Sequence, residues 1–355
     1  MNRKRYFGPA CLASLMLLCH IELTLASDDV RVLFYNVDNY FDCDNDSLTA
    51  DEEYLPGGLR GWTPARFWKK TGQIARVLAM AGSAPPDATI ANPDGDESAR
   101  RYGFPSLVGL AEIENEGCLR RLIRSSPLKN AGYEWIHYES PDVRGVDVAL
   151  LYNPYVFTLV SSKPVAVTFP EEPARKTRDV LYACFEVYGR QSLHVFVCHF
   201  PSRLGGEAET NVLRCRVAGV IKGMTDSLLS LSAETNVLIM GDFNDYPESQ
   251  SLTQVLGAGP PGSVSGLRLY NLMYPLTGNP EIGTYKHEGT WNILDQLIVS
   301  GALLCKSDHA RIFRPPFLLT NDDRWFGVKP FRTYNGMIYQ GGYSDHLPVF
   351  ADLHF

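Results

Sequence analysis

The sequence predicts a single α/β domain, and three observations support this prediction. Short runs rich in β-branched and aromatic residues alternate with amphipathic helical stretches along the 355-residue chain, a pattern typical of layered α/β proteins. Hydrophobic residues make up 45% of the chain and charged residues 21%, which suits a packed core and excludes disordered and fibrous proteins. No flexible interdomain linker stands out in the sequence, so one domain is expected.

The expected strands are apolar runs bounded by turn residues. They are Val30–Tyr35, Leu107–Ala111, Val146–Tyr152, Leu181–Tyr188, Leu193–Cys198, Val237–Met240, Leu294–Val299 and Leu347–Leu353. Helices are expected at Pro64–Met80, Gly117–Ile123 and Glu207–Leu231. The first of these has proline in its first turn and Ile74, Val77 and Leu78 at helical spacing. Stretches containing Pro, Gly or Asp are expected to be loops, namely Ser83–Tyr102, Val160–Thr177 and Gly257–Gly266.

The N-terminus has the pattern of a secretory signal peptide. Basic residues at positions 3–5 precede the apolar run Ala10–Cys19, and the stretch Thr24-Leu25-Ala26 then ends in a small residue. This pattern predicts a signal peptide at 1–26, which leaves one domain at 27–355, in a secreted or periplasmic protein. The apolar run is too short to span a bilayer comfortably, so no stable membrane insertion is expected, although an uncleaved anchor stays an alternative.

Charge and cysteine content narrow the classes further. The formal net charge of −7 is unlike that of a basic nucleic-acid coat protein, but it does not exclude a cleft that binds phosphate locally. No C-x-x-C pair is present, so neither a zinc ribbon nor a thioredoxin-type site is expected. Cys184 and Cys198 flank a turn near Gly189 and could form a disulfide across a hairpin in an oxidising compartment. Buried free thiols are the other interpretation.

Polar residues follow directly after four of the expected strands. Asn36, Glu112, His199 and Asp242 each stand at such a junction, and Asn244 comes two residues later. Ligand sites in layered α/β proteins gather beyond strand ends, where loops converge. A single polar residue at a strand end is more often a cap, but four junctions together suggest that these side chains meet in space.

The residue types indicate phosphate chemistry with a hard cation. Carboxylates and amides without cysteine ligands suit Mg²⁺, which takes a few carboxylates together with substrate phosphate. His199 and His346 could donate to phosphate or protonate a leaving oxygen, provided that a carboxylate orients each ring. Asp295 and Asp147 are available for that task. Ser344, Asp345 and His346 have the letters of a hydrolase triad, but consecutive residues of an extended segment point to alternate sides.

Several segments together resemble the endonuclease/exonuclease/phosphatase superfamily. This group includes DNase I-like nucleases, abasic-site endonucleases, inositol-polyphosphate phosphatases and neutral sphingomyelinases. The matching segments run in family order and are Phe34–Asp42, Leu110–Asn115, Arg144–Tyr152, Cys198–Arg203, Gly241–Asp245, Leu294–Gln296 and Ser344–Val349. They span nearly the whole chain after the signal peptide, and the fuller pattern resembles secreted bacterial members that are described as extracellular nuclease-like.

The resemblance implies a four-layer α/β sandwich, with two packed mixed β-sheets flanked by helices. It also implies hydrolysis of a phosphoester that depends on Mg²⁺, with Mn²⁺ as the alternative ion. By the family pattern Glu112 is the principal metal ligand, Asn36 assists it, and Asp345 lies near the metal. The sequence leaves open whether one or two ions act.

The same resemblance implies roles around the reacting phosphate. Asp242 would position or deprotonate the attacking water, and Asn244 would hold a phosphate oxygen. His346, oriented by Asp295, would contact the scissile phosphate. The remaining candidates are His199 at the leaving oxygen or the phosphate, Asp147 as its partner, Arg178 and Arg203 as phosphate contacts, and Asn39 as a supporting residue.

The leading hypothesis is a secreted, metal-dependent nuclease or phosphodiesterase. The acidic chain favours transient binding of nucleic acid without sequence specificity over tight binding driven by counterion release, and a monomer is the default expectation. An inositol-phosphate phosphatase or a sphingomyelinase-type enzyme is the alternative, and a catalytically silent binding module is a third. The aromatic stretch Phe313–Tyr343 is expected to pack on itself, or else to form a substrate wall.

Overall fold

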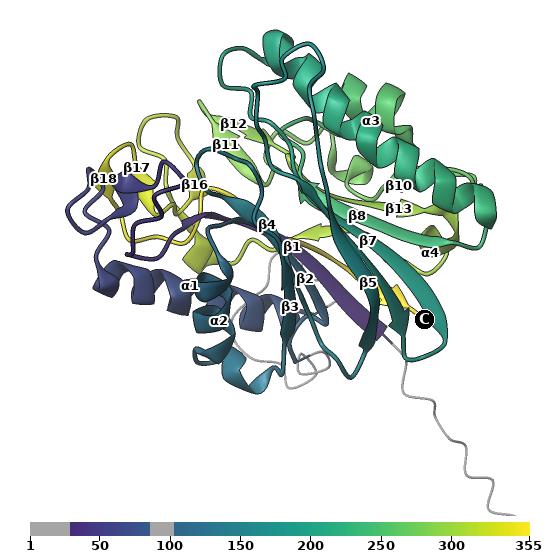
Figure 1. Cartoon of the computed structure of the whole chain (residues 1–355), viewed down its shortest axis with the longest axis horizontal. Helices are drawn as coiled ribbons and strands as arrows, with labels where there is room; N and C mark the ends of the chain where they lie inside the picture. The colour runs from purple at the N-terminus through teal and green to yellow at the C-terminus, as the bar shows by residue number, and fades with distance from the viewer. Residues whose placement is uncertain (1–28, 86–102) are drawn as a thin grey trace, which may run out of the picture.

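Two β-sheets pack face to face and helices cover their outer faces (Figure 1). The computed structural model describes residues 29–85 and 103–355. The predicted signal peptide, and most of the loop predicted at Ser83–Tyr102, lie outside the described residues. The arrangement confirms the predicted sandwich of two mixed sheets flanked by helices.

The first sheet has six strands in the order β14-β19-β1-β2-β4-β3. Strands β1 and β2 are parallel, and every other neighbouring pair in this sheet is antiparallel. In chain order its elements and the two helices on its outer face are β1 Asp29–Tyr40, α1 Pro64–Gly82, β2 Leu107–Ile113, α2 Glu116–Arg124, β3 Glu134–His137, β4 Asp147–Tyr152, β14 Arg311–Ile312 and β19 Val349–His354.

The second sheet has seven strands in the order β5-β6-β7-β8-β13-β10-β9. Strands β7 and β8 are parallel, and the long helix α3 connects them and covers the outer face (Figure 1). Its elements are β5 Phe157–Val165, β6 Val180–Val187, β7 Gln191–His199, α3 Glu207–Leu231, β8 Asn236–Asp242, the π-helix η4 Ser251–Leu256, β9 Ala258–Gly259, β10 Leu269–Asn271, β13 Asp295–Ser300 and α4 Gly301–Leu304.

Three small hairpins and four 3₁₀ turns complete the described chain. The hairpins are β11 Tyr285–His287 with β12 Thr290–Asn292, β15 Leu319–Asn321 with β16 Val328–Pro330, and β17 Tyr334–Asn335 with β18 Ile338–Tyr339. The 3₁₀ turns are η1 Glu52–Tyr54, η3 Leu128–Asn130, η5 Tyr274–Leu276 and η6 Pro316–Leu318.

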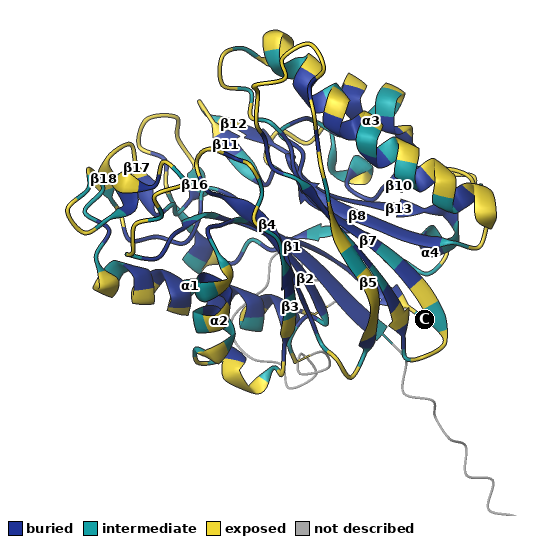
Figure 2. Ribbon diagram, in the orientation of Figure 1, coloured by how far each residue is buried: buried dark blue, intermediate teal, exposed yellow. Residues whose placement is uncertain are grey.

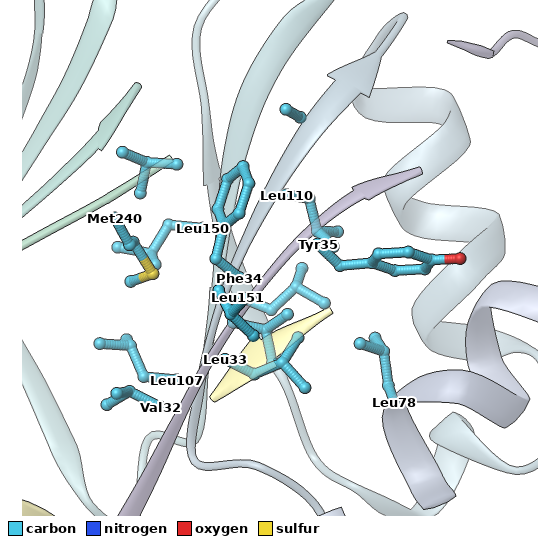
Figure 3. Close-up of a cluster of buried hydrophobic side chains, with 14 of the residues drawn as sticks. Val32, Leu33, Phe34, Tyr35, Leu78, Leu107, Leu110, Leu150, Leu151 and Met240 are labelled. Carbon is cyan, nitrogen blue, oxygen red and sulfur yellow. The ribbon is translucent and has the colours of Figure 1, made fainter. Parts of the chain in front are cut away.

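The main core lies between the two sheets. Phe34 of β1, Leu150 of β4 and Met240 of β8 point into the same space (Figure 3), and all three are fully buried. A Cβ atom on Gly109 of β2 would lie 2.7 Å from the Met240 sulfur, so glycine permits this close approach of the two sheets. The central strands of both sheets are almost continuously buried (Figure 2), whereas the edge strands β3 and β5 are partly exposed. A second apolar cluster fills the space between α3 and the second sheet.

Buried polar contacts fix the ends of the first sheet. Arg31 of β1 forms a double hydrogen bond with Asp352 of β19, and both side chains are fully buried. The Lys70 ammonium of α1 donates to the Thr333 hydroxyl and to the Tyr343 carbonyl. These contacts hold α1 against the chain segment that precedes β19.

The structure confirms the predicted strands and helices and adds several elements. The loop predicted at Val160–Thr177 begins with the last part of β5, whose residues are largely exposed. The loop predicted at Gly257–Gly266 contains β9, and β3 and β10 were not predicted. These strands are short or carry polar faces, so they lack the apolar run that marks a strand in sequence.

Of the two interpretations left open for Cys184 and Cys198, the structure agrees with free thiols and not with a disulfide. Strands β6 and β7 form the expected hairpin, but their register pairs Cys184 with His194 and Val197 with Leu181. Cys198 therefore lies several residues away along the hairpin, where its thiol donates to the Met240 carbonyl. All six cysteines of the described chain are free thiols. Among the described residues, no helix combines the length and the apolar character needed to cross a bilayer.

Candidate active site

A cleft of about 740 Å³ opens where the two sheets meet, beyond the carboxyl ends of β2, β7 and β8. Most of the residues predicted from the sequence line it. They are Glu112, His199, Arg203, Asp242, Asn244, Asp345 and His346. Asn36 and Asp295 lie directly behind this lining, where each contacts a lining side chain. The structure therefore brings together residues from near both ends of the described chain.

A bulge at the end of β2 directs Glu112 into the cleft. Its φ of +64° is unusual for a side-chain-bearing residue, and the ladders of β2 with both β1 and β4 shift register beside it. Bulges re-aim side chains, and such a backbone conformation costs about 1–3 kcal/mol. The Asn39 amide donates to the Glu112 Oε2 at 2.9 Å, which fixes one carboxylate oxygen and leaves Oε1 toward the cleft.

Asn36 connects the two sheets at the floor of the cleft. Its Nδ2 donates to the Asp242 Oδ2 at 3.1 Å, and its Oδ1 accepts from the Asp38 amide at 3.0 Å. The Asn36 carbonyl accepts from the Ser344 hydroxyl, which itself accepts from the His346 amide. One residue of β1 thus positions Asp242 through its side chain and the loop that precedes β19 through its backbone carbonyl.

The environment of His346 favours the protonated form of its ring. Its Nδ1 lies 2.7 Å from the Asp295 Oδ2, and its Nε2 lies 3.8 Å from the Asp242 Oδ2. Burial disfavours the charged ring, but the charges of Asp295 and Asp242 outweigh burial and raise the pKa of His346 well above its ordinary value. The predicted pairing of His346 with Asp295 is present in the geometry.

His199 has the opposite electrostatic environment. Its Nε2 lies 3.5 Å from the Asp242 Oδ2 and 3.9 Å from the Glu112 Oε1. Burial, together with the charges of Arg178 and Arg144, lowers the pKa of His199 well below its ordinary value. Within the described residues, its Nδ1 has no hydrogen-bond partner. His199 is therefore a neutral imidazole beside a protonated one.

Asp242 lies between the two rings. Burial, reinforced by the charge of Asp295, raises the pKa of Asp242 to about 7, although His346 acts against this rise. Its Oδ1 accepts from the Asn244 amide at 2.9 Å. Asn244 has a φ of +48°, and its Nδ2 donates to the Phe200 carbonyl. The carboxyl is thus held in place with a pKa suited to proton transfer near neutral pH.

The acidic end of the cleft fits a hard divalent ion. Asp345 is half-buried at the cleft, and its partial burial together with the charges of Asp38 and Glu112 raises its pKa to about 6. Carboxylate and amide oxygens of Glu112, Asp345 and Asn36 form an oxygen-only donor set of the kind that Mg²⁺ prefers. Asp242, Asp295 and His346 also cluster closely enough for a metal, but the His346 ring is already hydrogen-bonded and protonated, so it is a poor ligand.

Two predicted substrate residues have other partners. Asp147 lies 3.5 Å from the His137 Nε2 and accepts from the Ser140 amide, so the carboxylates next to His199 are Asp242 and Glu112 instead. The Arg178 guanidinium pairs with Asp142 and donates to the backbone carbonyls of His199 and Phe200. Arg178 is buried beneath the cleft and supports the end of β7.

Arg203 and Arg144 are the cations at the cleft rim. Arg203 packs over the Tyr246 ring at 4.7 Å and pairs with Glu207. Arg144 was not named as a site residue, although it begins the segment Arg144–Tyr152 that carries part of the family resemblance. The further lining residues that the sequence did not single out include Tyr246, Tyr285, His287 and Asn292. Tyr285, His287 and Asn292 belong to the short β11–β12 hairpin, and Tyr246 follows β8 in a loop. These segments are too short to carry a sequence signature.

The predicted aromatic stretch Phe313–Tyr343 packs mainly against α1. Phe313, Tyr334 and Tyr343 are buried, and Arg76 of α1 stacks over the Phe317 ring at 4.4 Å. This agrees with the interpretation that the stretch is a packed, loop-rich excursion. Trp325 and Phe326 differ, because their side chains are exposed by 43% and 82%.

Residues 31–354 match the sequence profile of the Endonuclease/Exonuclease/phosphatase family. The chain belongs to this family. The match covers nearly all of the described residues and includes every residue of the cleft discussed above. The carboxylates, amides and imidazoles grouped at the cleft are consistent with a family of enzymes that hydrolyse phosphoesters.

Solved structures share the fold of this family member at low identity. A Bacteroides thetaiotaomicron family protein is 15% identical, with 92% of this chain and 98% of that one covered at a TM-score of 0.55. A humanised Danio rerio TDP2 is 13% identical (93% and 100% covered, TM-score 0.54), and the human Nocturnin catalytic domain is 15% identical (92% and 94% covered, TM-score 0.50). No curated protein sequence matches the chain. At these identities the likeness establishes the fold.

Proposed function

We propose that this family member is a secreted, Mg²⁺-dependent phosphodiesterase that hydrolyses nucleic acid, with Mn²⁺ as the alternative ion. The observation that carries the proposal is the meeting of Glu112, Asp242 and His346 around one cleft, beside two imidazoles whose pKa values are shifted in opposite directions by their neighbours. Such an arrangement provides separate groups for water activation, phosphate charge and the leaving oxygen.

The proposed chemistry assigns one task to each residue. Asp242 accepts a proton from the attacking water, since its carboxyl titrates near neutral pH. The His346 imidazolium stabilises negative charge on the phosphate, and Asp295 keeps that ring protonated and oriented. The neutral His199 donates a hydrogen bond toward the leaving oxygen. A divalent ion held by the oxygens of Glu112, Asn36 and Asp345 would supply Lewis-acid stabilisation of the phosphoryl oxygens.

Nucleic acid is the favoured substrate because of the cleft's shape and rim. The cleft is open and polar, and its rim cations Arg144 and Arg203 can contact backbone phosphates without reading bases. The acidic chain favours transient binding, and the enzyme is proposed to act as a monomer. Export is proposed from the N-terminal sequence, and N-terminal sequencing of protein recovered outside the cytoplasm is expected to begin at Ser27.

A sphingomyelinase-type activity is the second candidate, and one surface feature favours it. The β17–β18 hairpin exposes Met337 and Ile338 at its tip, by 55% and 68%. Exposed apolar hairpins can dock on lipid. A phosphodiesterase that approaches a bilayer with this hairpin would cleave a phospholipid headgroup with the same catalytic residues.

Hydrolysis of bis-p-nitrophenyl phosphate with and without EDTA tests the proposed chemistry. We expect metal-dependent turnover of this diester, little turnover of p-nitrophenyl phosphate, and loss of about a hundredfold or more in Asp242→Asn. A panel of DNA, RNA, sphingomyelin and inositol phosphates then identifies the substrate. Full activity in EDTA, or of a folded Asp242→Asn variant, would contradict the proposal.

A further inference from the structure

A second cluster of metal-ligating side chains lies outside the cleft, at the start of β4. It consists of His137 at the end of β3, Glu139 two residues later, and Asp147 as the first residue of β4. One ligand atom from each residue lies within 4.8 Å of the others. Nothing in the proposed chemistry uses this cluster. Asp147 was expected beside His199 but lies beside His137 instead, so its place in the cluster has no explanation yet.

The register of β3 and β4 explains why the three side chains share one face. His137 is paired with Ala149 in this antiparallel ladder, so continuing the register by two residues sets Glu139 opposite Asp147. Like charges directly opposite each other destabilise a strand pair. A third carboxylate, Asp46, is close enough for its charge to act on Glu139. A positive charge at this position would offset the repulsion among these carboxylates.

The His137 ring is directed at this carboxylate pair. Its side chain is 4% exposed, its Nε2 lies 3.5 Å from the Asp147 Oδ2, and its Nδ1 lies 3.8 Å from the Glu139 Oε1. Within the part of the chain that the structure describes, Nε2 has no hydrogen-bond partner. Two ligands at about 2.1 Å from a tetrahedral metal are about 3.4 Å apart, which is the separation observed between Nε2 and Oδ2.

We propose that His137, Glu139 and Asp147 bind a first-row divalent ion of borderline softness, such as Zn²⁺, as a structural site separate from the cleft. One imidazole and two carboxylates form a donor set that suits Zn²⁺ better than the oxygen-only set at Glu112. The Asp147 Oδ1 accepts from the Ser140 amide, and this outer contact fixes the carboxylate with Oδ2 toward the ring.

The site would hold the β3–β4 loop, residues 138–146, at both of its ends. This loop carries Asp142, which pairs with the buried Arg178, and Arg144, which lines the cleft. A metal bound at the loop's two ends would restrict the position of Arg144 relative to the substrate. The ion would thus act on the cleft by positioning, without contact with the reacting atoms.

Zn²⁺ titration of the full chain against a chromophoric chelator tests the proposal. We expect His137→Gln to lose one Zn²⁺ equivalent, or to bind it at least about 10- to 100-fold more weakly. Even changes to residues that only contact a metal ligand cost that much affinity. Glu139→Gln is a second variant that should fold normally, because its side chain is 66% exposed, and it should weaken the same equivalent. The exposed His309 provides the matched control, since His309→Gln should bind Zn²⁺ as the parent does.

Glu112→Gln separates this proposal from the proposed function. Any Zn²⁺ that binds in the cleft should be lost in Glu112→Gln and kept in the His137 and Glu139 variants, while the new site should show the reverse. If the two cluster variants bind Zn²⁺ with the parent's stoichiometry and affinity, the proposal is overturned. That result would leave the proposed phosphodiesterase activity untouched.

Discussion

Asp295→Asn is the most informative single change, because it tests whether a buried carboxylate acts through His346. Asp295 is fully buried and lies 2.7 Å from the His346 Nδ1, and it does not line the cleft. Asparagine has nearly the same shape, so the change removes a negative charge while it keeps the packing. A pair of unit charges about 4 Å apart at an effective dielectric constant of about 20 interacts by about 4 kcal/mol.

That interaction energy sets the expected loss of activity. If the imidazolium is needed in the transition state, losing about 4 kcal/mol lowers kcat about a thousandfold, with little change in KM because Asp295 does not touch substrate. Steady-state hydrolysis of bis-p-nitrophenyl phosphate measures both constants. Urea unfolding of the same preparation shows whether the variant is folded.

A double mutant and a matched control complete this experiment. His346→Gln alone should lose as much activity as Asp295→Asn, and the double mutant should lose little more, because the two residues act as one unit. Asp308→Asn breaks a contact with the exposed His354 and should keep full activity. A folded Asp295→Asn enzyme with kcat within about threefold of the parent would refute the assigned role of His346.

Three further outcomes are expected. Glu112→Gln should abolish the rise in Tm that Mg²⁺ produces in the parent, as measured by differential scanning fluorimetry. Asp352→Ala should lower the free energy of unfolding in urea by about 3–5 kcal/mol, because it leaves the Arg31 charge buried. Burial lowers the pKa of His354, but contacts with Asp29 and Asp308 raise it more, so the net shift is upward. The contribution of these contacts to the free energy of unfolding is therefore fully present below pH about 6.5. It is lost as pH rises through the folded-state pKa. The urea midpoints of the parent and His354→Gln should therefore differ more at pH 5.5 than at pH 9, and since the His354 side chain is 45% exposed, a small difference is expected.

The sequence predicted the parts of the site that follow from strand ends. Asn36, Glu112, His199 and Asp242 each stand after an apolar run, and the structure places these junctions at one cleft. Position in the chain was sufficient because parallel neighbours such as β7 and β8 end at the same edge. The bulge that turns Glu112 into the cleft could not be predicted from the sequence, because it depends on register shifts in the pairing of β2 with both β1 and β4.

Partners that depend on register were beyond the sequence. Asp147 was expected beside His199, but its strand begins next to β3, so the ring that it meets is His137. Arg178 was expected to bind phosphate, but the end of β7 provides two carbonyls that accept from its guanidinium. A charged residue in the sequence shows that an ion pair or hydrogen bond can form. The packing of the strands determines which partner it contacts.

The two imidazoles of the cleft show how the fold divides labour between identical side chains. Both rings are buried, so burial alone would keep both neutral. His346 is backed by the carboxylate of Asp295, whereas His199 is backed by the cations Arg178 and Arg144. The strand β13 supplies the first partner, and the β3–β4 loop and the segment before β6 supply the second pair. The difference between the two rings therefore originates in the residues around them, of which Asp295 and Arg178 lie behind the cleft and Arg144 lines it. Arg178 thus acts on the His199 ring from beneath the cleft, a role that its expected phosphate contact would not have explained.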